Sequence, residues 1–139
     1  MILIGIDPGV NTGLAIWDTV TRELVDVQTM QIHTALELVK GDARLYGEGN
    51  LRVIFEDARM RGNSGAKSAA MAQGAGSVKR DCKIWEDFLT NLGVSWQAVS
   101  PKTKGAKVSA EYFRKLTGWE GRTSEHARDA AMLVYGRTK

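Results

Sequence analysis

The N-terminal part of the chain consists of short apolar runs separated by polar turns. Residues 2–6, 13–19 and 23–30 each form a run with the length and composition of a β-strand. Only the polar link 20–22 separates the second run from the third, which predicts a hairpin. We therefore expect the chain to open with three antiparallel strands.

Beyond this point, apolar residues recur at alternating spacings of four and three, which is the period of one face of an α-helix. The first set is Ile32, Leu36, Val39, Ala43 and Tyr46, and the second runs from Met71 to Leu92. Cys82 belongs to the second apolar face, so its thiol is expected in the core rather than in a reactive role.

The remaining apolar segments predict two strands and two helices. The runs 51–56 and 94–100 are short and predict strands, the second of them directly after Gly93. Residues 108–118 and 124–136 each show a helical pattern that ends in glycine. Ser124 has the side chain of an N-cap for the last helix.

The predicted order is three strands, a helix, a strand, a helix, a strand and two helices. Antiparallel strands followed by helix-connected, parallel strands indicate an α/β fold with a five-stranded mixed sheet flanked by helices. The 139 residues suit one domain, 1–139, that is large enough to bury a core.

Composition narrows the class of protein only slightly. Hydrophobic residues make up 43% and charged residues 25%, as in ordinary soluble proteins, and the net charge of +3 is compatible with a nucleic-acid partner without proving one. The single cysteine excludes an intramolecular disulfide and a cysteine-based zinc site. No apolar run approaches the ~20 residues of a membrane-spanning helix, and the N-terminus lacks the features of a secretory signal. We expect a cytoplasmic protein with no membrane partner.

Four side chains are candidates for chemistry. Asp7 lies at the end of the first predicted strand and Glu56 at the end of the fourth, so both carboxylates reach one sheet edge if these strands are parallel neighbours. His126 and Asp129 are three residues apart and share a face of the last helix. Converging acids repel each other unless a cation lies among them, and carboxylates suit Mg²⁺ or Mn²⁺. Two such ions, roughly 4 Å apart, can hydrolyse a phosphodiester.

Each of these motifs also has an ordinary structural explanation. An aspartate before Pro-Gly commonly forms a turn, and Glu56 with Asp57 could be solvated charges at a strand end. The last helix could simply begin with polar residues, with Glu125 pairing locally with Arg128. Singly, each explanation is acceptable; the ordered combination of strand-Asp, strand-Glu and helix-His-x-x-Asp favours a metal site.

The stretches "IGIDPGVNTGLAIW", "VIFEDARM", "AVSPKTKGAK" and "HARDAAMLVYG" resemble the RuvC-type Holliday junction resolvases of the RNase H-like superfamily. The resemblance covers nearly the whole chain. It implies an RNase H-like fold and Mg²⁺-dependent hydrolysis of DNA by a homodimer, whose two active sites cut opposed strands of a four-way junction. The chain is shorter than typical cellular members. A compact, phage-encoded version would act in a bacterial or phage-infected cell and would cut a wider range of branched DNA.

The same resemblance assigns roles to individual residues. Asp7, Glu56 and Asp129 would bind the metal ions. His126 takes a fourth place, where many members have aspartate and some histidine, and would bind the second ion or position water. Lys107 would be the cation near the scissile phosphate.

Basic residues beside these motifs would contact flanking phosphates, giving affinity without sequence reading. They are Arg59, Arg61, Lys67, Lys102 and Lys104. The loop after Glu56 lacks the aromatic residue that family members often use to stack on a base, so Met60 could wedge against a base step instead. Gly13, with the Pro-Gly pair before it, would keep bulk away from the approaching DNA backbone.

Three other functions fit parts of the sequence. An RNase H-like nuclease for RNA–DNA hybrids would share the acids but act as a monomer that contacts 2′-hydroxyls. An ATPase of the actin and Hsp70 type would also have an aspartate and glycines after its first strand, but it needs two such domains and a second glycine-rich phosphate motif. A non-catalytic junction binder gains nothing from acids clustered beside phosphates.

Overall fold

The computed structural model describes residues 1–60, 69–101 and 107–139, and for residues 69–75 only the backbone. Within these residues one five-stranded sheet has the order β3-β2-β1-β4-β5. β1 (Ile2–Asp7), β2 (Asn11–Asp18) and β3 (Glu23–Gln31) are antiparallel, while β4 (Leu51–Glu56) and β5 (Ser95–Val99) extend the sheet in parallel with β1. The predicted mixed sheet is confirmed.

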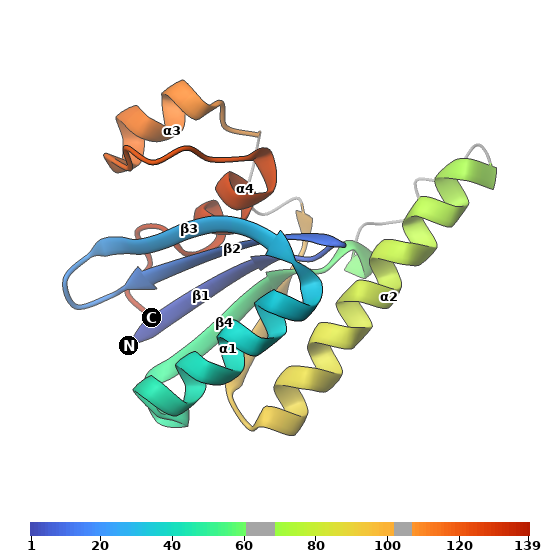
Figure 1. Cartoon of the computed structure of the whole chain (residues 1–139), viewed down its shortest axis with the longest axis horizontal. Helices are drawn as coiled ribbons and strands as arrows, with labels where there is room; N and C mark the ends of the chain where they lie inside the picture. Colours follow the sequence, from blue (N-terminus) through green and yellow to red (C-terminus); the bar gives the residue numbers. More distant parts are fainter. Residues whose placement is uncertain (61–68, 102–106) are drawn as a thin grey trace.

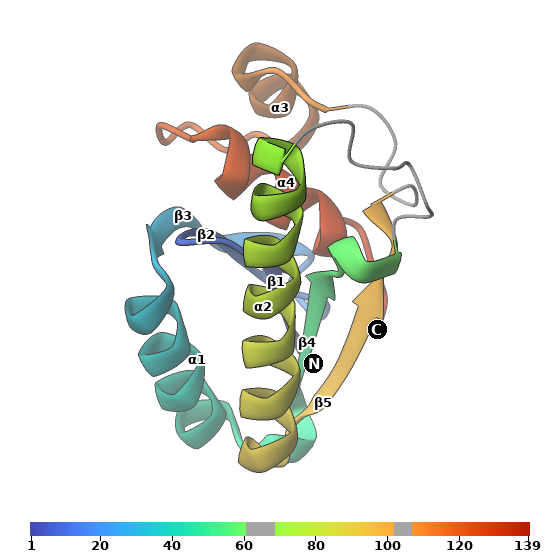
Figure 2. The same cartoon turned by 90° about the vertical axis from the view of Figure 1, so that its right-hand side faces the viewer.

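Helices cover both faces of the sheet (Figure 1). α1 (Ile32–Tyr46) and α2 (Ala69–Leu92) pack on one face, and α3 (Ala110–Thr117) and α4 (Glu125–Val134) on the other. Figure 2 shows α1 beside α2, with α3 and α4 gathered at the upper end of the molecule. Short 3₁₀ turns, η1 (Glu48–Asn50) and η2 (Ala58–Met60), precede and follow β4.

Capping residues mark where three of the helices begin or end. The Ser124 hydroxyl accepts a hydrogen bond from the amide of Ala127 at 3.1 Å and so caps α4. Gly93 and Gly118 adopt positive φ angles of 82° and 76° directly after α2 and α3. α4 itself ends at Val134, two residues before the glycine that the sequence pattern placed at its end.

Side chains of the central strands alternate between the two cores. In β1, Ile4 and Ile6 face α1 and α2, whereas Leu3 faces α4. Cys82 and Trp85 of α2 are fully buried in the first core, which confirms the predicted apolar stripe over the side chains that the structure describes. Across the described residues, no helix is long and apolar enough to span a membrane.

Two glycines bring α4 into direct contact with the sheet backbone. A Cβ atom on Gly5 would lie 2.2 Å from the carbonyl oxygen of Ala130, and one on Gly13 would lie 1.9 Å from that of His126. No side chain fits at either position. Gly13 was expected to leave room for DNA, but α4 occupies that space, so the glycine serves helix packing.

We expect Gly5→Ala to destabilise the fold by about 3 kcal/mol or more, because the added methyl overlaps a helix carbonyl that cannot move without lifting α4. Chemical unfolding of the purified variant measures this change. Gly41→Ala in α1 is the matched control, because a methyl group at that position would have no neighbouring atom within 4 Å; it should stabilise the protein by about 0.5–1 kcal/mol. Equal effects of the two variants would contradict the packing argument.

Candidate active site

Asp7 and Glu56 end neighbouring parallel strands. The last paired residues of β1 and β4 are Ile6 and Phe55, so the two acids follow at the same level of the sheet. The residues just before them, Ile6 and Phe55, face α1 and α2. Successive side chains of a strand point to opposite faces, so both acids face the α4 side. The predicted arrangement at one sheet edge is confirmed, with only 14% of the Asp7 side chain and 9% of Glu56 exposed.

The first turn of α4 adds His126 and Asp129 to this edge. Asp7 pairs with Gly13 in the sheet, and the His126 carbonyl lies directly on Gly13. The imidazole is therefore beside the Asp7 carboxylate, with 2.9 Å between His126 Nδ1 and Asp7 Oδ2. Asp129, one turn further along, is 7% exposed and lies on the buried side of the helix.

Lys107 approaches the same cluster from the segment before α3. Its ammonium group contacts the Glu125 carboxylate and lies 3.8 Å from Asp129 Oδ2. The hydrogen bond to Glu125, followed by attraction to Asp129, Glu125 and Asp7, raises the pKa of Lys107, and the same bond lowers the pKa of Glu125. Lys107 therefore lies beside Asp129 and Glu125, and its predicted place near a scissile phosphate stays a prediction.

Glu125 contacts Lys107, whereas one interpretation of the sequence paired it locally with Arg128. Arg128 instead donates hydrogen bonds to the carbonyls of Val108, at 2.9 Å, and Thr123, at 2.8 Å. It thereby holds the residue after Lys107 against α4. The only sequence signal for Glu125 was its position one helical turn before Asp129, which places both on one face.

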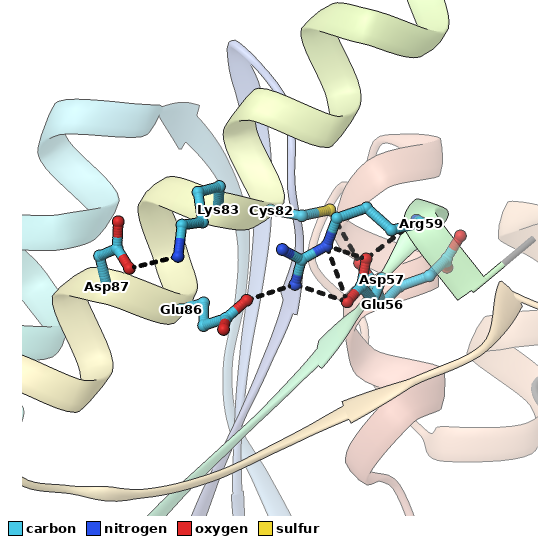
Figure 3. A network of polar contacts seen from close by, with 7 residues as sticks. All are labelled: Glu56, Asp57, Arg59, Cys82, Lys83, Glu86 and Asp87. Atoms are coloured by element: carbon cyan, nitrogen blue, oxygen red, sulfur yellow. Dashed lines mark hydrogen bonds and ion pairs between the residues drawn. The ribbon is translucent and has the colours of Figure 1, made fainter.

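Arg59 has partners other than the predicted DNA phosphate. Its guanidinium donates to the carboxylates of Asp57 and Glu86, and 31% of its side chain is exposed (Figure 3). Burial alone would raise the pKa of Asp57, but hydrogen bonds from Arg59 outweigh burial and hold it below its ordinary value. The same bonds raise the pKa of Arg59. The other predicted phosphate contacts, Arg61, Lys67, Lys102 and Lys104, lie outside the described residues.

The structure of T. thermophilus RuvC in complex with a Holliday junction substrate is similar to this chain. The two share 15% sequence identity, with a TM-score of 0.62, over 96% of this chain and 90% of that one. The chain has the RuvC fold. No protein-family model matches the sequence, and no curated protein matches it. At this identity the similarity defines the architecture, so function has to be argued from the site.

The donor set at the sheet edge fits a hard divalent cation. Asp7, Glu56 and Asp129 offer carboxylate oxygens from three separate elements, and such oxygens are the ligands that Mg²⁺ and Mn²⁺ prefer. Among the described residues, no three His, Cys, Asp or Glu side chains lie close enough together to hold one ion as they stand. The Asp7 and Asp129 carboxylates instead contact His126 and Lys107, whose side chains are 52% and 67% exposed.

Cys82 lies behind the site and donates a hydrogen bond from Sγ to the Glu56 carbonyl at 3.7 Å. Burial raises the pKa of its thiol to about 11. We expect native protein at pH 8 to resist alkylation of Cys82 by iodoacetamide and to become fully reactive in denaturant, because the thiolate is the reacting form. Mass spectrometry after timed labelling measures both rates. Rapid labelling of the native protein would show that the thiol is accessible and ionised.

Proposed function

We propose that this protein is a divalent-metal-dependent endonuclease that resolves four-way DNA junctions, and cuts related branched DNA, by paired nicks from a homodimer. The observation that carries the proposal is the position of Asp7 and Glu56 at the ends of neighbouring parallel strands, on the side of the sheet that α4 covers with His126 and Asp129. Acids gathered beside the phosphates of a DNA substrate would oppose binding unless they hold metal ions.

Asp7, Glu56, Asp129 and His126 would hold two Mg²⁺ ions, for which Mn²⁺ would substitute. The ions would activate water and stabilise the charge that develops at the scissile phosphate. In the neutral tautomer whose Nδ1–H donates a hydrogen bond to Asp7, Nε2 of His126 is an acceptor that can bind an ion or orient water. Lys107, 3.8 Å from Asp129 Oδ2, would supply the positive charge beside the phosphate.

The proposal also states how the protein would contact DNA, which substrate it would cut and where it would act. Arg61, Lys67, Lys102 and Lys104 would contact phosphates that flank the cut, giving strong salt dependence and little sequence reading. The similar RuvC structure holds a Holliday junction, which makes the four-way junction the first substrate to test. The protein would act in the cytoplasm of a bacterial or phage-infected cell.

The decisive experiment compares synthetic substrates in Mg²⁺ and in Mn²⁺. A four-way junction, a Y-fork, a flap, a linear duplex and an RNA–DNA hybrid are incubated separately with the protein, and the strands are separated on denaturing gels. Symmetric, paired nicks in the junction support the proposal. Preferential cutting of the hybrid would instead identify a nuclease for RNA–DNA hybrids.

Asp7→Asn should reduce junction cleavage by at least about 100-fold, because a neutral amide is a poor metal ligand at the proposed site beside His126. Junction binding, measured by gel shift in Ca²⁺ or without metal, should be unchanged or tighter, because one charge that repels phosphate is gone. Glu37→Gln on the exposed side of α1 removes the same charge elsewhere and serves as the control. Near-normal turnover by Asp7→Asn would refute the metal site.

A homodimer is expected because paired nicks on opposed strands require two active sites. Light scattering coupled to size-exclusion chromatography should give twice the mass of one chain, both alone and with junction DNA. A single chain bound to a junction that nevertheless receives paired nicks would contradict the dimeric arrangement.

A further inference from the structure

Two adjacent acids at the end of β4 lie on opposite sides of the sheet. Glu56 faces the side of α4, whereas Asp57 faces α2, and Figure 3 shows the Glu56 carboxylate pointing away from Cys82 and Glu86. The Asp57 amide donates a hydrogen bond to the Val99 carbonyl of β5 at 2.8 Å. This bond extends the β4–β5 pairing by one residue beyond Glu56.

The Asp57 carboxylate organises the turn that follows. It accepts a hydrogen bond from the Arg59 amide at 2.9 Å and closes an Asx-type turn over η2. It also receives the Arg59 side chain in a forked contact, with Nε at 2.9 Å from Oδ1 and Nη2 at 2.8 Å from Oδ2. Asp57 is 4% exposed, so the guanidinium is the counter-charge that makes its burial tolerable.

α2 holds this turn at two points, one helical turn apart. Arg59 Nη2 donates to Glu86 Oε2 at 2.6 Å, and Cys82 Sγ donates to the Glu56 carbonyl at 3.7 Å. The peptide group that joins Glu56 to Asp57 is therefore held at both polar atoms, its carbonyl by Cys82 and its N–H by Val99. A tied backbone fixes the direction in which the Glu56 side chain leaves the strand.

We propose that Asp57, Arg59 and Glu86 are positioning residues that hold Glu56 in its metal-binding direction. The inference rests on the proposed nuclease function and assigns to Arg59 a role other than phosphate contact. The charge of the group supports this role, because one guanidinium between two carboxylates leaves a net negative charge that repels a DNA backbone.

The experiment separates the positioning role from a DNA contact through Glu86, which is an acid and cannot itself bind phosphate. Glu86→Gln and Arg59→Gln are compared with wild type, with Arg59→Lys as a variant that keeps the charge and loses the fork. Asp87→Asn is the matched control, because it breaks the Lys83–Asp87 pair, 3.0 Å long, on the exposed side of the same helix. Circular dichroism and thermal unfolding establish that each variant is folded.

The primary measurement is Mn²⁺ affinity by titration calorimetry on protein without DNA. We expect Arg59→Gln and Glu86→Gln to weaken Mn²⁺ binding by about 10-fold or more, with a smaller loss for Arg59→Lys and none for Asp87→Asn. On junction DNA, kcat should fall in the same order while KM and its salt dependence stay constant. The double variant of Arg59 and Glu86 should lose little more than Arg59→Gln alone, because both changes break one linkage.

Three results would overturn the inference. If Arg59 binds phosphate, Arg59→Gln raises KM and reduces the salt dependence, while Glu86→Gln frees the guanidinium and tightens DNA binding. Unchanged Mn²⁺ affinity in both variants would leave the linkage with a structural role only. A wild-type protein that binds no Mn²⁺ and cuts no branched DNA would refute the proposed nuclease function itself. The first two results concern only the variants, so the two kinds of failure can be told apart.

Discussion

The contact between α4 and the backbone of β1 and β2 is the constraint on which the candidate site depends. Gly5 and Gly13 have no Cβ, so the carbonyls of Ala130 and His126 rest where side chains would otherwise be. A helix held further from the sheet would carry its acidic face away from the β1 edge. Because Gly13 pairs with Asp7, the same contact also sets which helix residue lies beside that acid.

The second determinant is the alternation of side chains at the end of β4. Successive residues of a strand face opposite sides, so Glu56 and Asp57 are adjacent in sequence but belong to different environments. Glu56 faces the α4 side of the sheet, and Asp57 is buried on the α2 side with Arg59 as its counter-charge. A slip of one residue in the β1–β4 register would exchange these environments.

Sequence patterns predicted the succession of strands and helices along the chain, the helix faces and the Ser124 cap, because each depends on residues within a few positions of one another. The edge shared by Asp7 and Glu56 followed from parallel strands. The partners of Arg59 and Lys107 did not, since Glu86 and Glu125 lie 27 and 18 residues away and any exposed acid could have served. The role predicted for Gly13 was wrong. A glycine leaves space for either a packed helix or an approaching ligand, and only the packing of α4 shows which of the two fills it.

Charge balance explains how such a cluster can form in a folded protein. Carboxylates brought together at a partly buried edge raise one another's energy, and an unpaired buried charge costs several kcal/mol in proteins. The Lys107 ammonium group offsets this cost at Asp129, and His126 lies within hydrogen-bond distance of the Asp7 carboxylate. Both are exposed enough to move without loss of core packing, whereas the acids are fixed by strands and helix. Strands and a helix hold Asp7, Glu56 and Asp129, which is what the proposed site for a divalent cation would require.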